Sequence, residues 1–132
     1  MRFPAEFRLS RASSAQVVVR AERAAVFPED TSTAKHDETG HVAWQAMPVL
    51  CEFILSSRGR QLLTSSRVLE LGAGIGVPAL LAGRVCRELI ITDSNDAVVE
   101  RLRRNVELNV GEMNCSGDAV RVENVPWGAD LF

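Results

Sequence analysis

The stretch RVLELGAGIGVPALLAGRVCRELIITDSN, residues 67–95, contains the pattern that decides the fold. A short apolar run carries Glu70 near its end, and a turn with glycine at every second position follows. Pro78 suits the first turn of the next helix, where its missing N–H is not needed. A second apolar run then ends at Asp93. This order predicts buried parallel strands joined by a helix, with a ligand site beyond the carboxyl ends of the strands.

The segments on either side extend this pattern. Ser94 or Asn95 can cap a helix whose apolar face holds several residues and which Gly111 is expected to end. These residues are Val98, Val99, Leu102, Val106 and Val110. A third strand is expected at 119–125, a helix at 47–57, a strand at 16–22 and a loop at 27–40. The fold class is therefore α/β, the N-terminal half of a doubly wound, mainly parallel sheet.

Composition excludes several classes of function. The chain has 132 residues, 46% of them hydrophobic and 24% charged, as expected for one globular domain. A net charge of −2 argues against a nucleic-acid partner. No apolar run reaches the roughly 18 residues that a membrane helix needs. The three cysteines are widely spaced and form no CxxC motif, which indicates a reducing compartment, and no standard metal-binding pattern is present.

The glycine turn predicts a nucleoside site. Gly72, Gly74 and Gly76 let the chain turn tightly and let a ligand approach the backbone. Asp93 ends the neighbouring strand at the same edge of the sheet. Its carboxylate can accept two hydrogen bonds from the hydroxyls of a ribose.

Glu70 and the glycine spacing favour one kind of nucleoside. Dinucleotide-binding folds use G-x-G-x-x-G, with the helix N-terminus facing a pyrophosphate. Here the third glycine comes one residue early, and a carboxylate beside the turn would repel a pyrophosphate. S-adenosylmethionine carries an ammonium and a sulfonium and no phosphate, so Glu70 favours it over NAD. The chain has no Walker lysine, which excludes a P-loop.

Longer motifs make the assignment more specific. ELGAGIG followed by ITD resembles the seven-β-strand methyltransferases that use S-adenosylmethionine. ETGHVAWQAMPVLCEFI before it, RLRRNVELN after it and VPWG beyond the third strand resemble the methyltransferase-16 family of protein-lysine methyltransferases. The resemblance covers roughly residues 38–130. It implies a Rossmann-like methyltransferase fold, with residues 1–39 as an N-terminal extension and 40–132 as a partial cofactor-binding domain.

The resemblance also implies a set of cofactor-binding residues: Trp44, Glu70, Gly72, Gly74, Asp93 and Trp127. Trp44 would lie at the entrance of the pocket and Trp127 against the adenine, while Asp93 would take the ribose hydroxyls. Asn105 and Asn109 match a family position, but we interpret them as structural. No residue of the chain is identified as a general base, and no metal is implied.

The family pattern predicts further strands beyond the third. Without a fourth strand the edge of residues 67–71 would be unpaired, and exposed apolar edges favour aggregation or pairing with a partner. The chain is therefore interpreted as a truncated protein-lysine methyltransferase, cytoplasmic or also nuclear, acting on a protein substrate. The alternatives are a small-molecule methyltransferase, a non-catalytic cofactor-binding remnant and a nicotinamide-dependent oxidoreductase.

Overall fold

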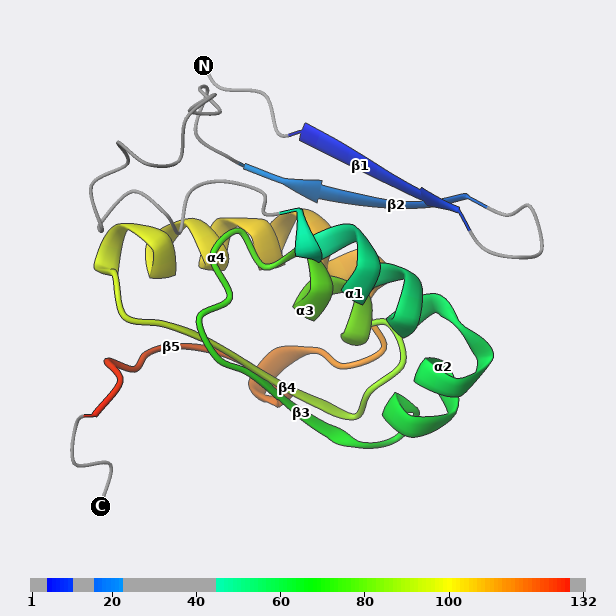
Figure 1. Ribbon diagram of the computed structural model, residues 1–132. Coiled ribbons are helices and arrows are strands. Elements are labelled where there is room, and N and C mark those ends of the chain that lie inside the picture. Colours follow the sequence, from blue (N-terminus) through cyan, green and yellow to red (C-terminus); the bar gives the residue numbers. More distant parts are fainter. Residues whose placement is uncertain (1–4, 11–15, 23–44, 129–132) are drawn as a thin grey trace.

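The computed structural model describes residues 5–10, 16–22 and 45–128. Within these residues the chain forms three layers, as Figure 1 shows. A two-stranded hairpin lies on one side, a three-stranded sheet on the other, and helices lie between them. The predicted α/β class is confirmed.

The three-stranded sheet consists of β3 (Arg67–Glu70), β4 (Glu88–Asp93) and β5 (Val120–Asn124). The strands lie in the order β3-β4-β5, and both pairs are parallel. Glu70 is in register with Ile91, and Asp93 is in register with Asn124. Parallel pairing therefore brings Glu70 and Asp93 to the same edge of the sheet, as the sequence predicts.

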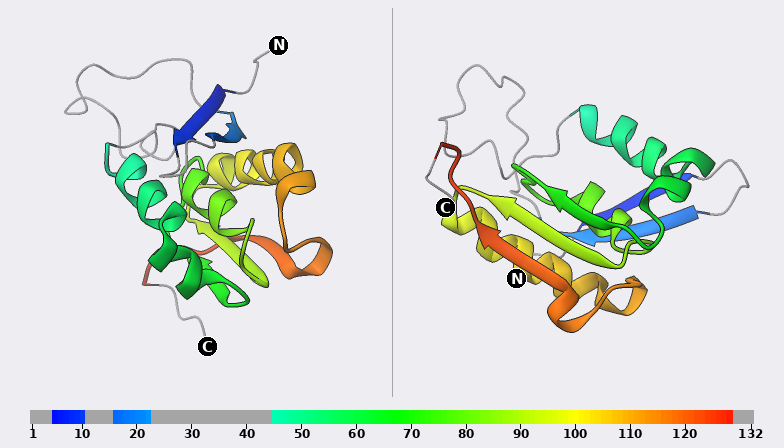
Figure 2. Two further views of the ribbon diagram at one scale, coloured as in Figure 1. Left: turned by 90° about the vertical axis from the view of Figure 1, so that its right-hand side faces the viewer. Right: turned by 90° about the horizontal axis from the view of Figure 1, so that it is seen from below.

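In the described part of the chain, four α-helices accompany the sheet: α1 (Ala46–Leu55), α2 (Ser57–Leu63), α3 (Val77–Ala82) and α4 (Asp96–Asn109). Helices α1, α3 and α4 cover one face of the sheet. The opposite face, seen from below in Figure 2, is covered by no helix among the described residues. Across that face Glu88 joins Arg67 at 2.6 Å and Arg121 at 3.1 Å. The arginines lower the pKa of the Glu88 carboxyl, Arg67 first.

The helix predicted at 47–57 is confirmed as α1, Ala46–Leu55, and it is followed by α2, which was not predicted. Ser56 leaves the helical region, with φ −64° and ψ 159°, and its hydroxyl accepts a hydrogen bond from the amide of Gly59 at 3.1 Å. Serine is a favoured residue at the start of a helix, and here it ends α1 and caps α2. The prediction missed α2 because the apolar periodicity of the first helix concealed this cap.

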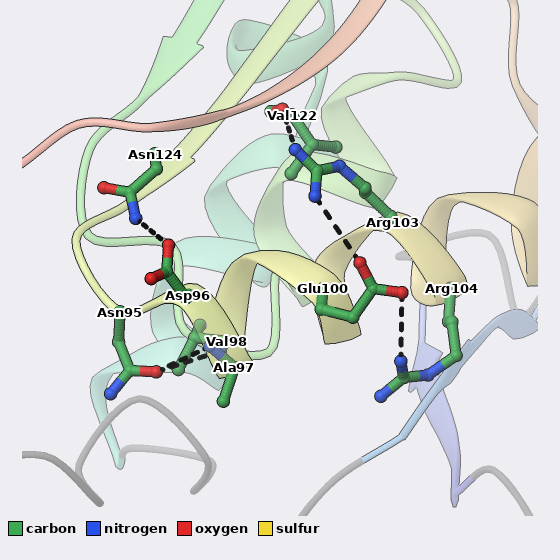
Figure 3. A network of polar contacts seen from close by, with 9 residues as sticks. All are labelled: Asn95, Asp96, Ala97, Val98, Glu100, Arg103, Arg104, Val122 and Asn124. Atoms are coloured by element: carbon green, nitrogen blue, oxygen red, sulfur yellow. Dashed lines mark hydrogen bonds and ion pairs between the residues drawn. The ribbon is translucent and has the colours of Figure 1, made fainter.

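Helix α4 begins as the sequence predicts, with Asn95 as its cap. Its side-chain oxygen accepts hydrogen bonds from the amides of Ala97 and Val98, as Figure 3 shows. Glu100 pairs with Arg104 one turn later at 3.4 Å, which is the expected helical pair.

The end of α4 differs from the prediction. The α-helix ends at Asn109, and a 3₁₀ turn, Val110–Glu112, runs through Gly111. Val110 was placed on the apolar face, but its side chain is 49% exposed. The tighter 3₁₀ turn rotates the chain away from the 3.6-residue period on which that placement rested.

The hairpin consists of β1 (Ala5–Ser10) and β2 (Gln16–Ala21), which pair antiparallel. The strand predicted at 16–22 is confirmed, whereas β1 was not predicted. Val17, Val19 and Ala21 of β2 are buried in one apolar cluster with residues of α1, α3 and the glycine turn. The hairpin therefore shares a core with the helices that cover the sheet.

The free edge of β3 is exposed. In the part of the chain that the structure describes, β3 pairs only with β4. Leu69 is 57% exposed and Leu71 is 58% exposed. Among the described residues, β3 therefore has one edge that pairs with no strand.

We predict that Gly76→Ala destabilises the fold by about 1–3 kcal/mol. Gly76 has φ +78°, and a Cβ there would lie 2.5 Å from Cδ2 of Leu102 on α4. Gly111→Ala is the matched control, because a Cβ at Gly111 meets nothing within 4 Å. Urea unfolding of both variants measures the difference, and equal stabilities would contradict the packing described here.

Candidate functional site

The glycine turn lies directly after β3. Gly72, Gly74 and Gly76 have φ values of 61°, 57° and 78°, so every second residue is in the left-handed region. Residues that carry a Cβ are strained in this backbone conformation, which explains why glycine recurs at this spacing. The turn ends at the first residues of α3, and Gly76 packs against α4.

Asp93 holds the turn against the end of β4. Its Oδ2 accepts a hydrogen bond from the amide of Gly74 at 3.0 Å, and its Oδ1 accepts one from the amide of Asn95 at 3.1 Å. The amide of Ala73 also donates to the carbonyl of Thr92 at 2.8 Å. A carboxylate has about four acceptor positions, so Asp93 keeps acceptor capacity for a ligand after these two bonds.

Glu70 lies beside the turn, and one of its carboxylate oxygens lacks a hydrogen-bond partner among the described residues. This oxygen, Oε2, is buried. Burial raises the pKa of the Glu70 carboxyl to about 7, and a hydrogen bond from the Ala79 amide offsets this in part. On α1, Cys51 faces the same region, where burial and then Glu70 raise its pKa to about 12. The site therefore has a carboxylate that a cation would stabilise.

Trp127 places an exposed aromatic ring at the turn. A Cβ built on Gly72 would lie 3.2 Å from Cζ2 of Trp127, so the indole lies close to this glycine. Trp127 is 78% exposed, so it is not packed in the core of the described residues. Trp44, the other predicted tryptophan, lies outside the described residues.

The structure thus brings five of the six predicted residues to one end of the sheet: Glu70, Gly72, Gly74, Asp93 and Trp127. Their chemistry fits a nucleoside that carries positive charge, because the site combines an uncompensated carboxylate, acceptor oxygens and an aromatic face. Among the described residues no group of three or more His, Cys, Asp and Glu could hold a metal ion. Within the same residues no helix is both long and apolar enough to cross a bilayer.

The sequence interpretation missed one residue at the turn. The Nδ2 of Asn105, on α4, donates to the carbonyl of Ile75 at 2.9 Å, between the second and third glycines. Asn105 was interpreted as structural, and its other bonds agree with that interpretation. The signal that could have identified it is an amide on the apolar face of the predicted helix, where a buried polar group needs partners.

Comparison with known proteins gives a consistent result. Residues 29–132 match the model of the family described as lysine methyltransferase. Over 90 residues the chain is 40% identical to protein N-lysine methyltransferase METTL21A of Xenopus tropicalis. This match covers 68% of this chain and 40% of that protein. The chain is 31% identical over 115 residues to protein N-terminal and lysine N-methyltransferase EFM7 of Yarrowia lipolytica, covering 74% of this chain and 41% of that protein.

A third relative covers less of the chain. Protein-lysine N-methyltransferase EEF2KMT of Mus musculus is 36% identical over 83 residues, which is 61% of this chain and 24% of that protein. The chain thus spans about two fifths or less of the length of these relatives. The match of the family model to most of the chain, together with the glycine turn described above, shows that the chain belongs to the lysine methyltransferase family.

Proposed function

We propose that the chain binds S-adenosylmethionine at the glycine turn and supplies the cofactor-binding part of a protein-lysine N-methyltransferase. The observation that carries this proposal is the buried Glu70 Oε2, which has no partner among the described residues. A buried carboxylate oxygen without a partner is costly, and a cationic ligand group would remove that cost. An NAD pyrophosphate would instead add a second negative charge.

The described residues suggest a place for each part of the cofactor. Glu70 would accept the ammonium group, Asp93 the ribose hydroxyls and Trp127 the adenine ring, while Gly72 and Gly74 leave room for close approach. The bound cofactor would supply the methyl group, and the chain would hold it in position for a neutral lysine amine. Catalysis of such a transfer depends mainly on alignment and exclusion of water.

The remaining parts of the proposal concern partners and compartment. The names of the relatives support a protein substrate with a target lysine. The net charge of −2 gives no support to a nucleic-acid partner. Cys51, Cys86 and Cys115 are buried and form no disulfide, which supports a reducing compartment such as the cytoplasm or nucleus.

Calorimetric titration of the full chain with S-adenosylmethionine tests the cofactor assignment. We expect Glu70→Gln and Asp93→Asn each to weaken binding by about ten- to a hundredfold, the range for loss of a hydrogen bond to a charged group. Glu107→Gln, a substitution at an exposed position of α4, should leave binding unchanged. A wild-type chain that binds NAD and not S-adenosylmethionine would overturn the proposal.

A transfer assay separates the remaining alternatives. The chain is incubated with a cell extract and S-adenosylmethionine labelled in its methyl group. Label in lysines of proteins supports the proposed reaction, whereas label only in small molecules supports a small-molecule methyltransferase. Cofactor binding with no transfer to either pool supports a non-catalytic cofactor-binding chain.

Binding should strengthen as the pH rises from 5.5 to 7.5. Because the pKa of Glu70 is about 7, the carboxyl is mostly neutral at pH 5.5 and must lose its proton to receive a cation. The association constant should therefore rise roughly tenfold per pH unit below 7 and level off above it. The range stops at 7.5 because α-amino groups lose their own proton near pH 8. Glu70→Gln should remove the slope, and a wild-type constant that stays flat would contradict this role.

The same carboxyl should make the ligand-free protein less stable at higher pH. Its folded pKa of about 7 lies above the ordinary value of 4.5, so the folded state binds the proton more tightly than the unfolded state. The stabilisation is fully present below pH 4.5 and is lost as the pH rises through 7. Glu70→Gln should consequently raise the free energy of unfolding at pH 8 relative to wild type. Urea unfolding at pH 5.5 and 8 measures the effect, and a less stable variant at pH 8 would count against it.

A further inference from the structure

Two asparagines on the inner face of α4 are fully buried. Asn105 is 0% exposed and Asn109 is 2% exposed, although each side chain carries an acceptor and two donor hydrogens. Burial of such amides is costly unless all these groups find partners. Their spacing of four residues places them one above the other on the same side of the helix.

Both amides bind the backbone of the hairpin. Asn109 accepts from the amide of Arg20 at 3.1 Å and donates to the carbonyl of the same residue at 2.6 Å. Asn105 accepts from the amide of Glu22 at 2.7 Å and donates to its carbonyl at 3.5 Å. The two side chains therefore donate to and accept from the backbone at β2, as a neighbouring strand would. These bonds hold the hairpin against α4.

Only Asn105 also reaches the glycine turn. Its Nδ2 donates to the carbonyl of Ile75 at 2.9 Å, whereas the third bond of Asn109 goes to the backbone carbonyl of Asn105 in the same helix, at 2.7 Å. Ile75 lies between Gly74 and Gly76, two residues with left-handed backbones. A single amide thus contacts the end of the hairpin and the middle of the turn.

Glycine-rich turns need such fixation. Each glycine has more accessible backbone conformations than any other residue, so a turn with glycine at every second position loses much entropy when it is ordered. The Asp93 carboxylate fixes the turn from the sheet side, at the amide of Gly74. Asn105 fixes it from the helix side, at the next residue, and depends on the hairpin for the position of its own side chain.

We propose that Asn105 is a positioning residue for the cofactor site, which couples docking of the β1–β2 hairpin to the binding conformation of the glycine turn through one side-chain amide. Asn109 performs only the docking. This inference rests on the proposed function for its ligand, S-adenosylmethionine. The coupling itself concerns contacts within the described residues, so it can be tested with and without the cofactor.

The test compares Asn105→Ala with Asn109→Ala in the full chain. Both variants remove an amide that binds the backbone at β2, and we expect similar decreases in the urea midpoint of unfolding. Asn105→Ala should also weaken binding of S-adenosylmethionine at least tenfold, whereas Asn109→Ala should stay within about threefold of wild type. Equal weakening of binding in the two variants would overturn the proposal.

Amide hydrogen exchange measured without ligand tests the coupling separately from the proposed function. Exchange at the amides of Gly74 and Gly76 should be several-fold faster in Asn105→Ala than in Asn109→Ala, because only the first variant releases the Ile75 carbonyl. If the wild type binds no cofactor, the proposed function fails, and faster turn exchange in Asn105→Ala still supports the coupling. Equal exchange rates in the two variants refute it.

The wild-type protein provides a test that does not require a variant to fold. Coupling is reciprocal, so a ligand that orders the turn must also stabilise the contact of Asn105 with the hairpin. Saturating S-adenosylmethionine should slow exchange of the Glu22 amide about tenfold, and that of the Arg20 amide, held by Asn109, less than threefold. Equal slowing at both amides would refute the coupling.

Discussion

The hydrogen bond from the Gly74 amide to the Asp93 carboxylate is the contact on which the site depends. It joins the middle of the glycine turn to the end of β4, and parallel pairing of β4 with β3 brings these two points together. The three left-handed glycines make the turn possible, but they do not select its conformation. The carboxylate selects it, and the same group must then keep acceptor positions open toward any ligand. The Asp93 side chain therefore fixes the conformation of the turn and also offers acceptor positions to the proposed ligand.

Glu70 shows the opposite arrangement. Asp93 has both oxygens engaged by backbone amides, whereas Glu70 has a buried oxygen with no partner in the described part of the chain. The ligand-free fold keeps this oxygen at a cost in stability, and burial shifts the pKa of the carboxyl to about 7 as a result. Groups that are unfavourable without a ligand are common where a protein has been selected for binding, since the ligand recovers the cost.

The core of the fold could be predicted from sequence because its signals are local. Apolar runs, glycine positions and the Asn95 cap each lie within a few residues of the element they define, so β3, α3, β4, α4 and β5 follow from them. Strand β1 was not predicted because its pairing with β2 defines it. Helix α2 was not predicted because its cap, Ser56, follows directly on the apolar pattern of α1. The Asn105 contacts link Glu22, Ile75 and α4, and no local pattern reveals a bond across 83 residues. At the site, the sequence could predict that five residues lie at one end of the sheet because the family motifs follow the ends of the strands. The contact of Trp127 with Gly72 depends on the path of the chain after β5.

The position of Trp127 has a consequence for observing the protein in solution. Trp127 is exposed and its indole lies close to Gly72, whereas the core of the described residues contains no tryptophan. Indole emission depends on the water around the ring, so a molecule that binds at the glycine turn would shift the emission wavelength of Trp127. The chain thus carries an intrinsic optical probe at the site itself, which reports occupancy on the timescale of mixing without any added label.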